Sequence, residues 1–423
     1  MAFRLLLQLF ELRNNLFLDA SRLRELQWKK LKPLLRHAYE NVPFYHQKFD
    51  QAKIKPEDIK ALEDLRKIPL TTREELQKSP LKFITASNID LGECVKTSTT
   101  GTTGMPFNII LDKRTVDYGN GLWFRTYERN GFRIWEKMAV IRHPNYFPKR
   151  YWFQNLGVMK RKYISVLDDV EHQIKALGQY QPDAVKSYSS SLVELARVLN
   201  HQSEPIRPRL IFTGGELLDC RARSLISSSF GTEVFDTYGT MEFSLVAWEC
   251  KAHAGYHINA DCVLTEFLDG VEEVAAGERG EVVCTGLNNY AMPLIRYEHD
   301  DIAVPIDDEC SCGVKLPLLK GIEGRENDFL MALDGRLISP WQFYPYPFDD
   351  YVGLKQFKVI QDRKDRLIFQ LIIEDSLFDV SRLDRARVTI QKLFGEEMQV
   401  DFEIVDEFQR DKSGKMRVIS RLF

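Results

Sequence analysis

The spacing of apolar residues changes along the chain, and each spacing predicts a different kind of structure. In the first ninety residues leucines recur at helical spacing, at Leu23, Leu26 and residues 31–35. Pro43 interrupts this pattern. Residues 71–75 (TTREE) combine hydroxyl side chains with acids, as the first turn of a helix often does. The N-terminal region is therefore predicted to be helical.

Beyond residue 130 short apolar segments alternate with helical patterns. The expected strands are 139–142, 183–187 and 210–213, and the expected helices are 168–178 and 192–199. This alternation is typical of an α/β fold, in which ligands collect at loops that follow the carboxyl ends of strands. From residue 239 strand patterns dominate, and two of the expected strands are 280–285 and 293–297.

The last hundred residues have a pattern of their own. Paired strands are expected at 357–360 and 367–373, an amphipathic helix at 381–394 and an alternating strand at 400–404. We predict an α/β protein with two domains. Residues 1–326 form a large multi-sheet domain with a helical N-terminal region, and residues 327–423 form a small α+β domain.

Composition narrows the class of protein. The chain has 423 residues, 44% of them hydrophobic, and a net charge of -3, which gives no reason to expect nucleic-acid binding. No apolar run is long enough to span a bilayer. The apolar start is broken by Arg4 and Gln8 and lacks a signal-peptide pattern. A packed or partner-facing first helix, compatible with a homodimer, is favoured over peripheral membrane association of an amphipathic helix.

Cysteine usage indicates the compartment. Seven cysteines, an odd number spread through a long chain, do not resemble a disulfide framework. A reducing cytoplasm fits this usage best.

One polar stretch is a candidate for phosphate binding. Residues 95–108 (VKTSTTGTTGMPFN) contain six hydroxyl side chains, two glycines and one proline, and they precede the strand-like segment 107–111. Glycine allows backbone N–H groups to converge on an anion, and the hydroxyls add neutral donors. The stretch is not a Walker A loop, because GxxxxGK[ST] is absent. The alternative is a flexible polar linker.

Four further polar clusters follow predicted strands or turns. They are residues 212–216 (FTGGE), 235–242 (FDTYGTME), 296–301 (RYEHDD) and 411–417 (DKSGKMR). Each by itself is more often structural than functional. Their order and spacing along the chain make the stronger case.

Together these motifs resemble those of acyl-adenylate-forming enzymes. The motifs are residues 99–104 (TTGTTG), 213–216 (TGGE), 238–242 (YGTME), 296–301, 324–325 (GR) and 413–415 (SGK). Residues 34–45 and 68–73 resemble the phenylacetate–CoA ligase branch, and within it the capsular-polysaccharide-biosynthesis (CapK-like) proteins. The resemblance implies an enzyme that activates a carboxylic acid on the α-phosphate of ATP and releases pyrophosphate.

The resemblance implies a role for each motif. Glu242 would bind Mg²⁺, which prefers oxygen ligands, while Tyr238 and Gly239 would line the adenine and acyl pockets. Asp301 would accept hydrogen bonds from the ribose hydroxyls, with Arg325 beside it. The remaining implied nucleotide-binding residues are Thr99, Thr100, Gly101, the catalytic Thr102, Thr103, Gly104, Gly214, Gly215 and Glu216.

A lysine in the C-terminal domain completes the implied machinery. Lys415 matches the mobile lysine whose charge lies between carboxylate and α-phosphate during adenylation. The small domain would then rotate, with Asp328 as the hinge, to admit CoA or an amine acceptor. The acid could be aromatic, a short hydroxy acid or an amino acid.

Three residues depart from the family pattern. Met241 stands in place of Thr or Ser, Asp300 in place of glycine, and Met105 where many relatives have lysine. The alternative function is therefore a catalytically weak nucleotide-binding relative that acts as a scaffold in polysaccharide assembly. An oxidoreductase is disfavoured, because no GxGxxG motif follows a strand.

A separate group of residues is a candidate metal site. Cys250 and His257 lie close in sequence, and Cys310 and Cys312 form a CxCG knuckle. Three thiolates and one imidazole suit a tetrahedral, structural Zn²⁺, and some members of the resembled branch have zinc at these positions. His253 competes with His257 as the fourth ligand. The alternative is a set of buried free cysteines.

Overall fold

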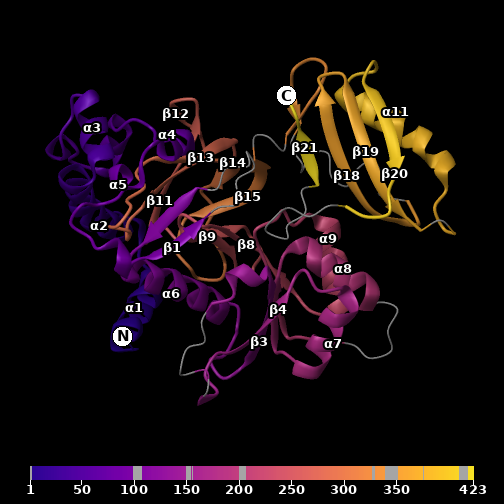
Figure 1. The fold of residues 1–423 in the computed structure, drawn as a ribbon, viewed down its shortest axis with the longest axis horizontal. Coiled ribbons are helices and arrows are strands. Elements are labelled where there is room, and N and C mark those ends of the chain that lie inside the picture. Colours follow the sequence, from indigo (N-terminus) through magenta and orange to yellow (C-terminus); the bar gives the residue numbers. More distant parts are fainter. Residues whose placement is uncertain are drawn as a thin grey trace. The chain divides into compact units, whose positions relative to one another are not determined.

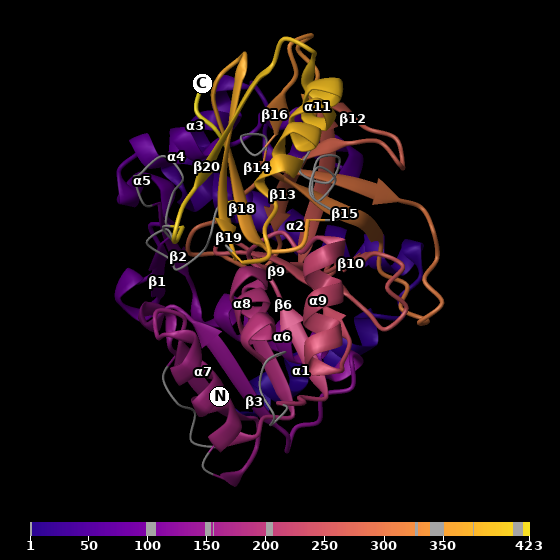
Figure 2. The ribbon, with the colours of Figure 1, turned by 90° about the vertical axis from the view of Figure 1, so that its right-hand side faces the viewer.

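The protein is described by a computed structural model that covers residues 2–98, 107–148, 154, 156–199, 206–325, 329–338, 351–374, 376–408 and 418–423. The chain divides into two compact units. Figures 1 and 2 show the helices and strands along the chain. The first unit contains Met1–Ile134, Phe235–His299 and Ala303–Ile322, and the second contains Trp135–Val234, Asp300–Ile302 and Glu323–Phe423. The fold is the mixed α/β arrangement of several sheets that the sequence predicts.

The N-terminal region is helical, as predicted. Asp19 begins α2 by accepting a hydrogen bond from the N–H of Arg22, and Pro43 begins α3 directly after α2 ends. Thr72 and Glu75 form a reciprocal capping box that begins α4. The helices of this unit are α1 (Ala2–Asn15), α2 (Ala20–Asn41), α3 (Pro43–Gln51), α4 (Arg73–Lys78), α5 (Leu81–Ile84) and α6 (Lys113–Arg129).

The end of α1 packs against α6. Leu12 is fully buried in the same hydrophobic cluster as Tyr118 and Leu122 of α6. A Cβ at Gly121 would meet Cδ1 of Leu12 at 2.7 Å, so any other residue would require Leu12 to shift. Among the described helices, none has the length and apolar character required to cross a bilayer. Membrane association through α1 and a homodimer stay predictions.

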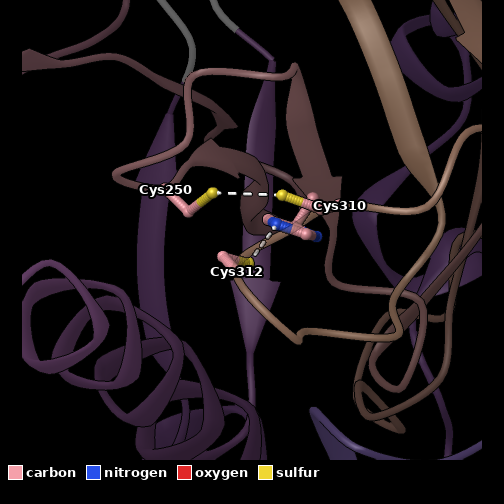
Figure 3. Close-up of side chains that lie close together, drawn as sticks. Cys250, Cys310 and Cys312 are labelled. Atoms are coloured by element: carbon pink, nitrogen blue, oxygen red, sulfur yellow. Dashed lines mark hydrogen bonds between the residues drawn. The ribbon is translucent and has the colours of Figure 1, made fainter.

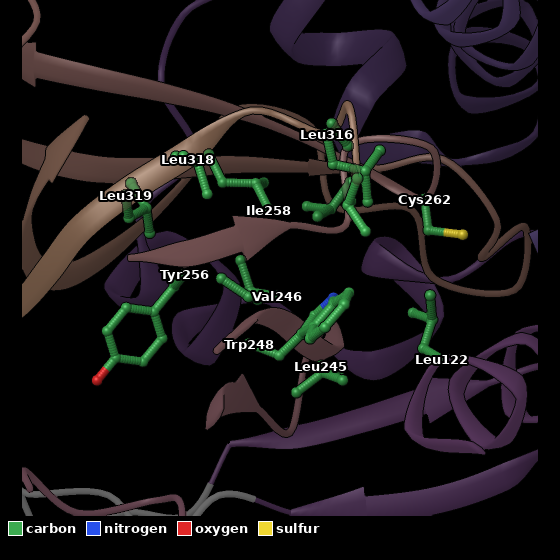
Figure 4. Packing of buried hydrophobic residues seen from close by; sticks show 14 of the residues in the cluster. Leu122, Leu245, Val246, Trp248, Tyr256, Ile258, Cys262, Leu316, Leu318 and Leu319 are labelled. Carbon is green, nitrogen blue, oxygen red and sulfur yellow. The ribbon is translucent and has the colours of Figure 1, made fainter. Parts of the chain in front are cut away.

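An eight-stranded sheet forms the centre of the first unit, with strand order β12-β11-β13-β14-β15-β10-β9-β8. Its inward residues, Trp248 and Ile258 among them, pack with leucines from other strands (Figure 4). The strands are β8 (Thr237–Thr240), β9 (Ser244–Glu249), β10 (Tyr256–Ile258), β11 (Val263–Asp269), β12 (Glu272–Glu273), β13 (Gly280–Gly286), β14 (Tyr297–Ile306) and β15 (Leu318–Arg325).

One predicted strand is wrong. Residues 293–296 are not a strand, and β14 begins only at Tyr297. Arg296 has a φ of 47°, outside the extended region. Its guanidinium pairs with Glu266 and donates to the carbonyl of Ile68, so side-chain contacts hold this segment in an irregular conformation.

A fully buried ion pair joins α6 to the loop between β10 and β11. Nη1 of Arg125 donates to Asp261 at 2.8 Å and to the carbonyl of Leu12 at 2.7 Å, and Nη2 donates to Asn259. Both charged side chains are wholly buried. Burial alone would raise the pKa of Asp261, and the adjacent Arg125 keeps that pKa below its ordinary value.

Removing this arginine is expected to be costly. Arg125→Met should lower the free energy of unfolding by about 3–5 kcal/mol, because it leaves the carboxylate of Asp261 buried without its main cation. Denaturant unfolding measures this. The matched control is Arg114→Met on the exposed side of the same helix, with an expected change within about 0.5 kcal/mol. Equal stability of both variants would contradict the assigned role.

The second unit contains a five-stranded sheet of order β4-β3-β5-β6-β7, in which the pairings from β4 to β6 are parallel. The predicted alternation of strands and helices after residue 130 is confirmed. Helices α7, α8 and α9 pack on one face of the sheet, against Ala139, Ile141, Val185 and Ile211. The elements are β3 (Lys137–Arg142), β4 (Lys160–Ser165), α7 (Val170–Tyr180), β5 (Ala184–Ser187), α8 (Ser189–Leu199), β6 (Leu210–Thr213), α9 (Cys220–Phe230) and β7 (Val234–Phe235).

The C-terminal residues form a second sheet with order β20-β19-β18-β21 and a hydrophobic core of their own. The predicted β-β-α-β pattern is confirmed, and β21, which was not predicted, adds parallel to β18. The elements are β16 (Leu330–Met331), β17 (Leu337–Ile338), β18 (Leu354–Arg363), β19 (Arg366–Ile373), α11 (Leu383–Phe394), β20 (Gln399–Ile404) and β21 (Ile419–Arg421). A domain boundary at residue 326 stays a prediction.

Candidate functional site

Two strands flank the candidate phosphate loop. β1 (Val95–Ser98) pairs antiparallel with β2 (Asn108–Leu111), with Ser98 opposite Asn108. β1 is half exposed, whereas Ile109 and Ile110 of β2 are buried. The candidates Thr99, Thr100, Gly101, Thr102, Thr103, Gly104 and Lys415 lie outside the described residues, so their roles stay predictions.

The glycine-rich turn after β6 is fixed by its acid. Glu216 accepts hydrogen bonds from the backbone N–H of Ser190 at 2.9 Å and from its hydroxyl at 3.0 Å. Ser189 donates to Glu216 at 3.3 Å and to the carbonyl of Leu217 at 2.9 Å. Glu216 therefore stabilises the N-terminus of α8, which favours a negative charge. It holds Gly214 and Gly215 at the carboxyl end of the parallel sheet, where ligands of α/β proteins collect.

Three candidate residues lie on β8 or in the turn that joins it to β9. Tyr238 and Gly239 lie on β8, beside a bulge in its pairing with β9, and Glu242 lies in the turn itself. A Cβ at Gly239 would lie 2.5 Å from the carbonyl oxygen of Ser244, so only glycine fits there. The hydroxyl of Thr240 accepts a hydrogen bond from the N–H of Phe243 and stabilises the turn.

Glu242 is a buried carboxylate in largely aromatic surroundings. It accepts a hydrogen bond from the phenolic hydroxyl of Tyr297 at 3.4 Å, and Tyr297 packs in turn against Phe107 and Phe243. A buried carboxylate is costly unless hydrogen bonds or a cation compensate its charge. Tyr297 supplies one hydrogen bond, and a cation at this position would add to that compensation. Met241 packs against a hydrophobic cluster, which accounts for an apolar side chain at this position.

The candidate ribose acid lies on β14. Asp301 is buried, and the preceding Asp300 has a φ of 59°, in the left-handed region. Glycine adopts this conformation at no steric cost, and Asp is among the other residues that tolerate it. The backbone of Arg325 ends β15, and its side chain lies outside the described part of the chain.

Four potential metal ligands come together in the first unit. Their donor atoms lie within 4.8 Å of one another. Cys250 and Cys310 are 3.5 Å apart between sulfurs, and Sγ of Cys312 is 3.3 Å from Nε2 of His257. The labelled cysteines point toward one another in Figure 3. Cys250 follows β9, His257 lies on β10, and the knuckle joins β14 to β15.

The surroundings of this cluster favour a cation. Burial lowers the pKa of His257 to about 4, so its imidazole is neutral and able to ligate. Burial also raises the pKa of Cys250 to about 12, so a thiolate here requires a compensating positive charge. His253 stacks on Phe235 with ring centroids 5.4 Å apart and is not one of the clustered ligands.

Comparisons with known proteins decide the family. The sequence model of the CapK C-terminal domain matches residues 332–421. The phenylacetate–coenzyme A ligase of Escherichia coli is 31% identical over 295 residues, which are 66% of each chain. The chain belongs to the adenylate-forming ligases, on the phenylacetate–CoA ligase branch. Protein CapK of Staphylococcus aureus is 22% identical over 412 residues, 93% of this chain and 88% of that protein. The match spans about two thirds of the Escherichia coli ligase.

Solved structures of CoA ligases share the fold of this adenylate-forming family member. For the crystal structure of 2-hydroxyisobutyryl-CoA ligase in the postadenylation state, the TM-score is 0.80 and the sequence identity is 20%. The similarity covers 96% of this chain and 91% of the ligase chain. The anthranilate CoA ligase AuaEII, in complex with anthranoyl-AMP, has a TM-score of 0.59 at 13% identity. The α/β fold predicted from the sequence is therefore that of CoA ligases.

Proposed function

We propose that the protein activates a small carboxylic acid with ATP as an acyl-adenylate, releases pyrophosphate, and transfers the acyl group to CoA or to an amine. The main support is the buried Glu242, which lies in the turn that follows Tyr238 and Gly239 of β8, in a chain of the phenylacetate–CoA ligase branch. Such a carboxylate is the kind of ligand that Mg²⁺ takes. Mg²⁺ would neutralise phosphate charge during the attack of one anion on another.

The other proposed roles follow from position and chemistry. Asp301 accepts hydrogen bonds from the ribose hydroxyls, and Arg325 lies beside the ribose. Thr102 and the rest of residues 99–104 hold the phosphates, and Gly214 and Gly215 allow the adenine to approach the backbone. Residues 327–423 are the mobile domain that carries Lys415. Each of these assignments belongs to the proposal.

We propose a structural zinc ion held by Cys250, His257, Cys310 and Cys312. Three sulfurs and one imidazole nitrogen match the donors and the number that tetrahedral Zn²⁺ takes, and the gathered donor atoms are close enough to share one ion. All seven cysteines are free thiols, and thiolate ligands persist in a reducing compartment such as the cytoplasm. The ion would tie β9 and β10 to the loop after β14.

A role in polysaccharide assembly is the narrower form of this proposal. It is supported by the match to the CapK C-terminal domain and by the similarity to Protein CapK along most of the chain. Met241 supports the second candidate, a catalytically weak nucleotide-binding scaffold, because it removes a hydroxyl that the family prefers at this turn.

ATP–pyrophosphate exchange tests the proposal. Purified protein is incubated with ATP, labelled pyrophosphate and a panel of aromatic, hydroxy, dicarboxylic and amino acids. At least one acid should give exchange well above the acid-free rate. A protein that binds ATP but exchanges with none of them would reject the enzyme and favour the scaffold.

A further inference from the structure

The motif at residues 296–301 places a tyrosine against the carboxylate of Glu242. Tyr297 is the first residue of β14, and only 2% of it is exposed. Its phenolic hydroxyl donates a hydrogen bond to Oε1 of Glu242 at 3.4 Å. Within the described part of the chain, no other group donates to this carboxylate. Tyr297 therefore engages one oxygen of Glu242, and Oε2 is left for another partner.

Three aromatic rings fix the side chain of Tyr297. The ring of Phe107 lies nearly parallel to it, with ring centres 6.5 Å apart and planes at 15°. Phe243 packs on it with ring centres 6.2 Å apart, and His299 meets it edge-on at 5.2 Å. A closely packed side chain is confined to one rotamer. The direction of the Tyr297 hydroxyl is therefore set before any ligand binds.

The backbone of Tyr297 is anchored as well. Thr71 and Tyr297 form an isolated parallel bridge. The N–H of Thr71 donates to the carbonyl of Arg296 at 2.7 Å, and the N–H of Glu298 donates to the carbonyl of Thr71 at 3.0 Å. Thr71 is itself fully buried, directly before the capping box that begins α4. Tyr297 is thus held through both its side chain and its main chain.

The packing of Tyr297 joins two parts of the candidate site. Phe107 directly follows residues 95–106, which contain the candidate phosphate loop, and Phe243 directly follows Glu242. The ring of Tyr297 packs against both. Phenylalanine would fill the same space without burying a hydroxyl, which costs free energy unless it is hydrogen-bonded. The hydroxyl of Tyr297 is bonded to Glu242, so the reason for a tyrosine here lies with that carboxylate.

A supported carboxylate is a better metal ligand than a free one. Carboxylates that bind metal ions are usually hydrogen-bonded themselves, and these partners orient the ligand. Without such a partner, the long side chain of a glutamate samples several orientations, and ordering it on binding costs conformational entropy. The bond from Tyr297 to Oε1 reduces that cost for Glu242.

We propose that Tyr297 is a positioning residue for magnesium: its hydroxyl orients Glu242 for the Mg²⁺ ion that accompanies ATP. This inference rests on the proposed function, in which Glu242 is the magnesium ligand. Tyr297 acts through the carboxylate and is not itself a ligand. Loss of a partner of this kind typically costs about 10- to 100-fold in metal affinity or activity.

Binding of ATP with and without Mg²⁺ tests the inference. The dissociation constant of ATP is measured by equilibrium dialysis in saturating Mg²⁺ and in buffer freed of divalent cations. No chelator is added, so the proposed zinc site stays intact. The ratio of the two constants measures how strongly Mg²⁺ supports ATP binding.

The test variant is Tyr297→Phe, which keeps the ring and removes the hydroxyl. The ratio is expected to fall about tenfold or more, while ATP binding without Mg²⁺ stays unchanged. An unchanged ratio overturns the inference, and so does an equal loss of ATP binding in both buffers.

A second buried tyrosine provides the matched control. Tyr45 belongs to the same unit and is buried to the same degree, and its hydroxyl accepts a hydrogen bond from the N–H of Ile295 at 2.8 Å. Tyr45→Phe also removes a buried hydroxyl, so its melting temperature should fall as that of Tyr297→Phe does, but its ratio should not change. An equal fall of the ratio in both variants would show a general effect of losing a buried hydroxyl and would overturn the inference.

A double variant tests whether Tyr297 acts through Glu242. Glu242→Gln removes the charge and should lower the ratio by itself. Adding Tyr297→Phe to that variant should lower the ratio no further, because the effect of the hydroxyl depends on the carboxylate. A further fall of about tenfold would contradict the proposed role.

Pyrophosphate exchange separates this inference from the proposed function. If no acid gives exchange, the enzyme is rejected, yet the ATP-binding ratio still decides the role of Tyr297 because it needs no acid. If exchange is observed and Tyr297→Phe has the wild-type ratio, the proposed function stands and the inference fails. If the wild-type protein binds no ATP, or binds it equally well without Mg²⁺, the inference fails together with the magnesium role of Glu242.

Discussion

Replacing Lys415 with alanine is expected to reduce the rate of adenylation by at least about 10²–10³-fold, while ATP still binds. The reason is that a carboxylate must approach the α-phosphate of ATP, and two anions repel each other. A lysine ammonium between them stabilises the charge that develops in the transition state. Ground-state binding of ATP depends mainly on other contacts, so it should persist.

The same segment of the sequence offers a matched control. Lys412 lies three residues before Lys415 in the segment 411–417 and has the same side chain. Lys412→Ala should keep adenylation close to the wild-type rate. Exchange assays measure the rate, and equilibrium dialysis measures ATP binding. An unchanged rate in Lys415→Ala, or an equal loss in both variants, would contradict the proposed role.

Periodic segments were the part of the fold that the sequence predicted best. The strand–helix alternation after residue 130 and the C-terminal β-β-α-β pattern are local, because each strand or helix shows its buried face in its own spacing. The cap at Thr72 was equally visible, since a hydroxyl followed three residues later by Glu75 is enough to form a capping box.

Features that depend on distant contacts were missed. The segment before Tyr297 has a strand-like composition. The guanidinium of Arg296 forms a salt bridge with Glu266 and donates hydrogen bonds to the carbonyls of Arg66 and Ile68, and these contacts hold the segment in an irregular conformation. The contact of Glu216 with Ser189 and Ser190 joins two strand–helix turns 26 or 27 residues apart. The sequence around Glu216 did not indicate that Ser189 and Ser190 would be its partners.

The candidate metal site has one feature that the sequence predicted and one that depends on distant contacts. The CxCG knuckle was visible in the sequence, because two cysteines one residue apart can project from a single turn. The sequence could not decide between His253 and His257 as the fourth ligand, because both follow Cys250 closely. The pairing of β10 decides it: His257 lies opposite Trp248 of β9 and Leu318 of β15, next to the knuckle. His253 is turned toward Phe235 and Glu249.

Loss of one zinc ligand is expected to be the most destabilising change in the first unit. Purified protein should contain about one zinc ion per chain, and Cys310→Ser should lose it. The ion would join segments 60 residues apart, Cys250 and Cys310, and zinc-finger peptides gain about 10–16 kcal/mol from such a site. Because the surrounding core is already folded, we expect a smaller loss of unfolding free energy, on the order of 5 kcal/mol or more.

A control substitution at a second buried cysteine distinguishes the effect of losing the metal from the effect of burying a serine hydroxyl. Cys262 lies in the same hydrophobic cluster but is not one of the clustered ligands. Cys262→Ser should lose about 1–3 kcal/mol, keep its zinc, and still be destabilised by a chelator. Cys310→Ser should no longer respond to the chelator, because it has no ion to lose. Elemental analysis and thermal unfolding with and without chelator measure both effects. A metal-free wild-type protein that is fully stable would show that the four residues are buried free thiols beside a histidine.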